Sequence, residues 1–90
     1  MTLELRTTAA FERDLRRLRK QNKNLDKIEA VVELLQNQRP LPPRYRSHPL
    51  RGTWTGHWDC HIEPDWLLLY KLTTEALILV RTGSHSELFG

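Results

Sequence analysis

His57-Trp58-Asp59-Cys60-His61-Ile62-Glu63-Pro64-Asp65-Trp66-Leu67-Leu68-Leu69-Tyr70-Lys71-Leu72 is the stretch of the sequence that decides the fold. Its first part, residues 57–63, alternates polar and apolar residues, as a strand with one solvated and one buried face does. Pro64-Asp65 has turn chemistry, and residues 66–72 return as a strand that is apolar on both faces. The stretch therefore predicts a β-hairpin that places His61 and Asp65 at one edge of a sheet.

Length and composition indicate one small globular domain, residues 1–90. The chain is 39% hydrophobic and 28% charged, which suits a soluble protein with a single modest core. No apolar run approaches the roughly 20 residues needed to cross a bilayer, and the N-terminus lacks the features of a signal peptide. Cys60 is the only cysteine and lies on the apolar side of its strand. We therefore expect a buried thiol and a reducing, cytoplasmic location.

The charge is distributed unevenly along the chain. Residues 1–51 contain 12 Lys and Arg against 6 Asp and Glu, a balance of +6, whereas residues 52–90 contain 2 against 5, a balance of −3. A basic half can bind a polyanion by displacing its counterions. The alternative is a solvated helix face, and composition alone favours that interpretation.

The first half of the chain predicts a short strand over residues 2–6 and two helices. Thr7 and Thr8 are good N-cap residues for the first helix, and Asn24 for the second. The two apolar stripes consist of Phe11, Leu15 and Leu18, and of Leu25, Ile28, Val32 and Leu35. Their short connector favours an antiparallel helical hairpin that ends before Pro40. The outer face of the first helix is basic and consists of Arg13, Arg16, Arg17, Arg19 and Lys20.

A long connection rich in proline and arginine, residues 41–52, follows the helices. Its apolar residues Leu41, Tyr45 and Leu50 predict that it is laid across the domain rather than free in solvent. A third strand is expected over residues 76–81, and residues 85–90 form a tail of about one helical turn.

The charges suggest a register for the three strands. If Asp59 lies opposite Lys71, then His61 opposes Leu69, and pairing Leu69 with Leu79 places Arg81 beside Leu67. One face of the sheet then holds His57, Asp59, His61, Glu63, Lys71 and Arg81. The other face holds Trp58, Cys60, Ile62, Leu68, Tyr70, Ile78 and Val80, and should receive the helical hairpin.

Three histidines, His48, His61 and His85, are candidates to converge at the hairpin tip. Imidazole titrates near neutrality, so two of them can act as the base and the acid of one reaction. Arg81 can hold a phosphate, and Trp66 or Phe89 can stack on a base. These groups suit cleavage of RNA by its own 2′-hydroxyl. Zinc is the alternative, but the ligands would straddle a turn, so we expect neither a metal nor another cofactor.

The motifs around these residues resemble those of a known family. They are His48-Pro49-Leu50-x-Gly52-x-Trp54-x-Gly56, Asp59-x-His61-x-Glu63-Pro64-Asp65-Trp66, Tyr70-Lys71-Leu72, and Arg81-Thr82-Gly83-x-His85 with Leu88-Phe89-Gly90. In this order they resemble the YafQ branch of the RelE/ParE toxin superfamily. The resemblance is dense over about residues 40–90, and the N-terminal part fits the family's strand and helical hairpin.

The resemblance implies an α+β, RelE-like fold and a toxin of a type II toxin–antitoxin system that cuts mRNA on the translating ribosome. The acid–base residues would be His48, His61, Asp65 and His85, with His85 as the candidate general acid. The RNA-binding residues would be Arg81, Trp66 and Phe89, and the basic first helix would contact ribosomal RNA. An antitoxin that binds DNA would neutralise the protein, so operator DNA would be reached only through their complex.

Two other functions remain open from the sequence. A ParE-like toxin of the same fold would bind a protein target such as gyrase without nuclease chemistry. A plain RNA- or DNA-binding module would bind nucleic acid through the basic half of the chain, and the histidines would have no catalytic role. The set of titratable groups at one edge favours the nuclease, because a non-catalytic binder does not need it.

Overall fold

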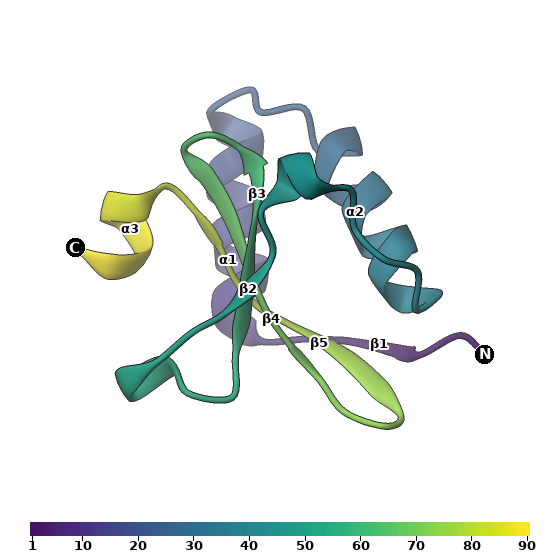
Figure 1. Ribbon diagram of the computed structural model, residues 1–90. Coiled ribbons are helices and arrows are strands. Elements are labelled where there is room, and N and C mark those ends of the chain that lie inside the picture. Colours follow the sequence, from purple (N-terminus) through teal and green to yellow (C-terminus); the bar gives the residue numbers. More distant parts are fainter.

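A five-stranded sheet forms the middle of the structure, a computed structural model that describes residues 1–90 (Figure 1). The strand order is β1-β5-β4-β3-β2; β1 runs parallel to β5 and the other neighbours are antiparallel. The strands are β1 (Glu4–Thr7), β2 (His48–Pro49), β3 (Trp58–Glu63), β4 (Trp66–Leu72) and β5 (Ala76–Gly83). The helices are α1 (Ala9–Lys20), α2 (Asp26–Gln36) and α3 (His85–Phe89), with 3₁₀ turns η1 (Pro43–Tyr45) and η2 (Gly52–Trp54). The predicted α+β class is confirmed.

The two long helices begin close to the predicted caps. The Thr8 hydroxyl accepts a hydrogen bond from the Phe11 N–H (3.0 Å), so Thr8 is the N-cap of α1. The N-cap of α2 is Leu25 rather than Asn24, although the Asn24 side chain still accepts from the Asp26 N–H (3.1 Å). None of the helices has the length and hydrophobicity that crossing a bilayer requires.

The main core lies between the two long helices and one face of the sheet. Its members include Phe11 and Leu18 of α1, Ile28, Val31 and Leu35 of α2, and Cys60, Ile62, Trp66, Leu68, Tyr70, Leu77 and Leu79 of the sheet. Cys60 is fully buried as predicted, and burial raises the pKa of its thiol to about 12. The predicted anchors Leu41 and Tyr45 of the long connection pack against this core, so that connection is laid across the domain.

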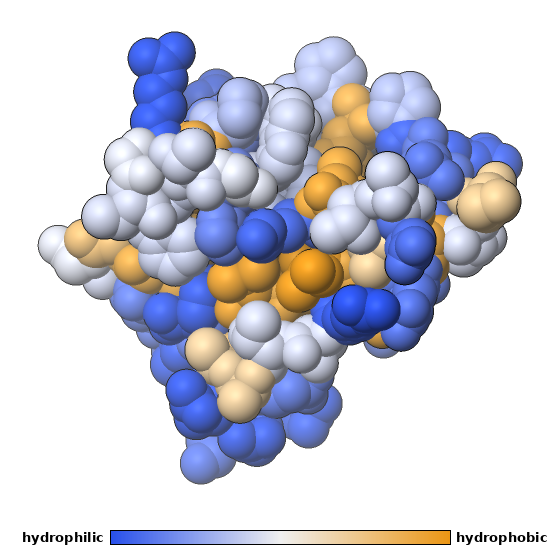
Figure 2. Space-filling model, turned by 90° about the horizontal axis from the view of Figure 1, so that it is seen from below, coloured by the Kyte–Doolittle hydropathy of each residue, from blue (hydrophilic) through white to orange (hydrophobic).

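The opposite face of the sheet carries a second, smaller cluster. Leu67, Leu69 and Leu88 are buried there, with Leu50, Trp54 and Val80 packed against them. The α3 helix and the second half of the long connection therefore cover part of the face that also carries His61. Seen from below, the surface of the molecule shows hydrophobic residues gathered in a central band with hydrophilic residues around it (Figure 2).

The predicted register was wrong by two residues between β3 and β4. Asp59 pairs with Leu69 and His61 with Leu67, instead of Lys71 and Leu69. A shift of two keeps every β3 side chain on its predicted face, because the strand period is two. The β4–β5 register was also wrong: a shift follows the Leu69–Arg81 pair, so Leu79 lies opposite Tyr70. Leu77 and Leu79, rather than Ile78 and Val80, therefore face the helices.

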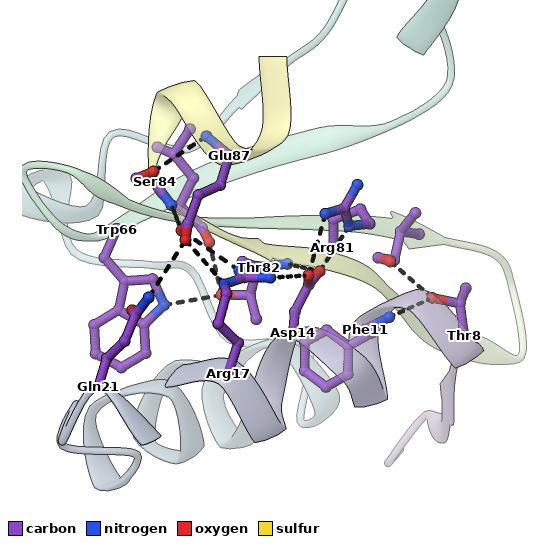
Figure 3. Close-up of polar contacts among 12 residues, drawn as sticks. Thr8, Phe11, Asp14, Arg17, Gln21, Trp66, Arg81, Thr82, Ser84 and Glu87 are labelled. Carbon is purple, nitrogen blue, oxygen red and sulfur yellow. Dashed lines mark hydrogen bonds and ion pairs between the residues drawn. The ribbon is translucent and has the colours of Figure 1, made fainter. Parts of the chain in front are cut away.

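Helix α1 closes the part of the β5 edge that β1 leaves open (Figure 3). β1 pairs only with residues 76–79 of β5, so the backbone of the next residues needs other partners. The Thr8 hydroxyl donates to the Val80 carbonyl (2.7 Å), and the Thr82 N–H donates to Asp14 Oδ2 (3.1 Å). Arg17 Nη2 donates to the Thr82 carbonyl (3.0 Å). Polar side chains of a helix thus replace the missing strand.

Asp14 is the centre of this contact and is almost fully buried. Arg81 Nε and Nη2 donate to its two oxygens at 2.6 and 3.1 Å, and Arg17 Nη1 donates at 2.7 Å. Burial raises the pKa of Asp14, but the hydrogen bonds from Arg81, Arg17 and the Thr82 N–H outweigh it, so the pKa is lowered overall. Asp14 is therefore ionised and fully paired.

Replacement of Asp14 by Asn should destabilise the fold, because two partly buried guanidinium groups lose their counter-ion while the side chain keeps its shape. We expect a loss of about 2–3 kcal/mol in the free energy of unfolding at pH 7, measured by urea denaturation. Because the folded-state pKa is lowered, the contribution of Asp14 is present above the ordinary carboxyl range and disappears as the pH falls through the lowered value. The difference between wild type and variant should therefore shrink on acidification.

The exposed Asp26 at the start of α2 provides a matched control for that experiment. Asp26→Asn should cost less than about 1 kcal/mol, because it removes only a surface charge near a helix N-terminus. Equal effects of the two substitutions would contradict the role given to Asp14.

Candidate active site at the hairpin tip

His85 and Asp65 form the best-defined contact of the predicted site. His85 is the first residue of α3, whose N-cap Ser84 forms a reciprocal capping box with Glu87. Asp65 lies in the tip of the β3–β4 hairpin and accepts from both the His85 N–H (3.0 Å) and His85 Nδ1 (2.6 Å). These two bonds lower the pKa of Asp65, so its carboxylate is the acceptor and Nδ1 carries the proton. The Nε2 atom of His85 is then free for a substrate.

His61 lies next to His85. Their ring centroids are 5.6 Å apart and the rings meet edge to face at 71°. One ring comes from the end of β3 and the other from α3, so the hairpin tip and the C-terminal helix build the pair together. Two imidazoles at this separation can contact opposite sides of one reacting group.

His48 approaches the same face from β2, the strand that pairs with Asp59 and Trp58. Its Nδ1 is 3.0 Å from the Arg46 carbonyl, which can only accept, so this nitrogen carries the proton. The same nitrogen is 2.9 Å from Asp59 Oδ1, but the bond is not aligned with that oxygen. His48 therefore has its ring fixed by the backbone and a carboxylate beside it.

Asp59 is the residue of the site that the sequence analysis did not assign. It is 4% exposed, and its Oδ1 has no hydrogen-bond partner. Burial raises the pKa of Asp59, and His48, His61 and His85 act in the opposite direction through their charge. Burial is the larger effect, so the pKa of Asp59 is raised overall. Its position on the same strand face as His61 was the signal available in the sequence.

Arg81 and Trp66 do not lie as predicted. Two of the three guanidinium nitrogens of Arg81 are bound to Asp14, so only Nη1 is left for a phosphate. Trp66 is 1% exposed and its indole donates to the Thr82 hydroxyl (2.9 Å). The prediction that Trp66 can stack on an RNA base is therefore wrong in this structure, because the ring belongs to the core. The apolar residues that follow Trp66 in β4 were the sequence feature that indicates its burial.

Phe89 is 45% exposed at the end of α3, the helix that begins at His85, and its ring packs edge to face on Trp54 (6.1 Å between centroids). Four of the five basic residues named on α1 are exposed: Arg13, Arg16, Arg19 and Lys20. The fifth, Arg17, is bound to Asp14 and Thr82, and its Nε lies 2.9 Å from Glu87 Oε2. The prediction that Arg17 contacts ribosomal RNA does not fit these contacts, since its guanidinium holds α3 instead.

No three His, Cys, Asp or Glu side chains are arranged as metal ligands. The remaining predicted groups, His48, His61, Asp65 and His85, do come together, on the sheet face opposite the two long helices. The fold and this cluster define a class: a small α+β protein with histidines and carboxylates grouped at one edge of its sheet, as the resemblance to RelE-like toxins predicts.

Comparison with known proteins agrees with this class. The sequence profile of the family described as "Bacterial toxin of type II toxin-antitoxin system, YafQ" matches residues 3–90. The mRNA interferase toxin YafQ of Escherichia coli is 41% identical over 88 residues, which span 97% of this chain and 96% of that protein. YafQ in the crystal structure of the E. coli DinJ-YafQ toxin-antitoxin complex is 40% identical, with a TM-score of 0.92 over 100% of both chains. A metal-bound toxin from Helicobacter pylori is 42% identical, with a TM-score of 0.92 over 97% of this chain and 99% of that one.

The chain therefore belongs to the YafQ family of bacterial toxins of type II toxin-antitoxin systems. This confirms the family that the sequence motifs indicated, and the TM-scores confirm the predicted RelE-like fold.

The environment of Asp59 leads to a prediction about stability. Replacement of Asp59 by Asn should raise the free energy of unfolding by about 1 kcal/mol at pH 7, because burial disfavours the charged carboxylate more than the neighbouring histidines favour it. Since the folded-state pKa is raised, the destabilisation by Asp59 is present above that pKa and vanishes as the pH falls into the ordinary carboxyl range. The gain should therefore disappear near pH 4 in urea denaturation curves, and a loss of stability at pH 7 would contradict it.

Proposed function

We propose that this protein is an endoribonuclease that cuts translated mRNA on the ribosome, and so arrests translation, by metal-independent acid–base catalysis. The observation that supports this proposal most directly is the Asp65–His85–His61 cluster. The Asp65 carboxylate fixes the His85 ring, whose centroid lies 5.6 Å from that of His61. The mRNA interferase activity named for the E. coli relative supports the substrate. The protein would act in the cytoplasm, where its substrate is translated.

The proposed reaction is attack of a ribose 2′-oxygen on the adjacent phosphorus. One imidazole removes the 2′-hydroxyl proton, the 2′-oxygen–phosphorus bond forms, and the phosphorus–5′-oxygen bond breaks. A second imidazole gives its proton to the leaving 5′-oxygen. The products are a 2′,3′-cyclic phosphate and a free 5′-hydroxyl.

His85 is the proposed general acid. Its Nδ1 donates to Asp65, which stabilises the imidazolium and presents Nε2–H to the leaving group. His61 or His48 is the proposed base. Asp65 acts as a positioning residue, and Arg81 Nη1 offers charge to the phosphate.

An antitoxin is the proposed neutralising partner, as DinJ is for YafQ in the E. coli complex. Operator DNA would be bound only by the toxin–antitoxin complex. The ribosome is the proposed platform for cleavage, and the exposed basic side chains of α1 are the proposed contact with its RNA.

Replacement of His85 by Gln should abolish cleavage while the fold is kept, because the exposed ring contributes to no core. We expect a decrease of about 10²–10⁴-fold in the rate of cutting of a translated message, measured by primer extension on mRNA from an induced translation extract. His57→Gln is the matched control: the His57 ring meets Trp54 edge to face and contacts the Trp54 carbonyl, and this variant should cut at the wild-type rate.

Two outcomes would contradict the proposal. Translation arrest by the wild type with uncut messages would favour a toxin that binds a protein target. Absence of both arrest and cutting, with RNA binding retained, would favour a plain binding module.

Charge reversal on α1 tests the ribosomal contact separately from the chemistry. The combined substitution of Arg13, Arg16 and Lys20 by Glu should reduce co-sedimentation with ribosomes at least about tenfold at low salt, since three exposed cations are lost. Stability to urea should be unchanged, because these side chains take no part in the Asp14 network. Unchanged co-sedimentation would show that this helix face is only solvated.

A further inference from the structure

A hollow lies beside His61, between the start of α2, the η1 turn and the end of β3. Its volume is about 700 Å³, within the range of small-molecule sites. The lining used below consists of Lys27 and Ala30 of α2, Arg44, Tyr45 and Arg46 at η1, and His61. β2 pairs only with residues 58 and 59 of β3, so the outer edge of β3 at His61 carries no strand and opens into this hollow.

The charges of the hollow favour an anion. Lys27 is paired with Glu63 (2.7 Å), so these two charges offset each other. Arg44 and Arg46 then stand against Asp26 alone. The exposed side chain of Arg46 extends from a residue in the left-handed region (φ 48°), whose carbonyl accepts from His48. Arg46 therefore lines the hollow and also contacts His48 through its backbone carbonyl.

Arg44 and Tyr45 together offer a flat stacking surface. The Arg44 guanidinium carbon lies 4.7 Å from the centroid of the Tyr45 ring, and its Nη2 is 3.1 Å from the Tyr45 hydroxyl. The ring packs against the main core, so the pair is held in place from behind. Unpaired RNA bases stack on arginine planes as well as on aromatic rings.

An RNA strand that is cut at His61 and His85 must continue on both sides of the scissile phosphate. On the α3 side, Phe89 is exposed for a base. On the other side, Trp66 is buried and cannot serve, and the next flat, cationic surface is Arg44–Tyr45. A nucleotide adjacent to the cut is the occupant that fits both the charge and the continuity with His61.

We propose that this hollow is a nucleotide subsite, in which the Arg44–Tyr45 pair stacks on the base next to the cut and Arg46 binds the neighbouring phosphate. The inference rests on the proposed RNA cleavage and deepens it. It assigns substrate binding to the long connection between α2 and β3, in addition to the histidine that this segment carries.

The test separates binding from chemistry by using a trinucleotide with 2′-O-methyl groups on its first and central riboses, so that neither of its two phosphodiester bonds can be cut. In an NMR titration of the wild type, amide shifts are expected at Ala30, Tyr45 and Ile62 as well as near His85. The double variant Arg44→Gln with Arg46→Asn should lose the first group of shifts and bind at least about tenfold more weakly. Asn is chosen at position 46 because it tolerates the left-handed backbone. The exposed Arg39, outside this hollow, provides the control Arg39→Gln, which should bind as the wild type does.

Kinetics on programmed ribosomes provide the second readout. The double variant should raise the half-saturating concentration about tenfold and leave the rate at saturation within about threefold, because the histidines are untouched. Wild-type values of both the trinucleotide affinity and the half-saturating concentration would overturn the inference while the proposed function stands. So would variants that bind the trinucleotide normally but escape the antitoxin, since the hollow would then be a peptide site. A wild type that cuts no RNA would instead refute the proposed function.

Discussion

The carboxylate of Asp14 is the contact on which both the sheet and the site depend. β1 covers only the first half of β5, and the backbone beyond it would be left unsatisfied without a helix side chain. Asp14 accepts from the Thr82 N–H, binds Arg81, and holds Arg17, whose Nε reaches Glu87 of α3. Gly83 permits this close approach, because a Cβ there would lie 2.6 Å from Arg17 Nη2. The sheet edge and the helix that begins at His85 are thus fixed by one buried group.

The sequence was sufficient to predict the secondary-structure elements and which β3 residues share a face of the sheet. It did not predict how β4 pairs with β5 or what covers the edge of β5. Alternation in β3 placed Asp59 and His61 on one face whatever the register, because an error of two residues leaves a strand's faces unchanged. The register shift between β4 and β5 does change the faces, so Leu77 and Leu79 lie on the helix side, contrary to the prediction. Asp14 stands on the apolar stripe of α1 between Phe11 and Leu18, and this exception to the pattern was the signal for a buried ion pair. Its partner Arg81 lies 67 residues away, which no local pattern indicates.

The two aspartates of the site have opposite environments, and this suits different tasks. Asp65 is exposed, accepts two hydrogen bonds from His85 and has a lowered pKa, so it remains a fixed anion that orients one ring. Asp59 is buried, its Oδ1 accepts no hydrogen bond, and burial raises its pKa. A fold does not gain stability from such a group, which makes Asp59 a candidate for a functional role beside His48. Catalytic carboxylates are often separated in this way by their surroundings rather than by their identity.

The arginines show the same division between structure and function, and composition alone could not reveal it. Arg17 and Arg81 are bound to Asp14, and they stabilise the edge of β5. Arg44 and Arg46 take part in no ion pair and lie at a hollow that opens beside His61. A positive net charge therefore overstates what is available to a polyanion, because Asp14 offsets part of the charge of Arg17 and Arg81. Most of the basic residues that take part in no ion pair lie on α1 and around η1, and these are the surfaces that we propose for RNA.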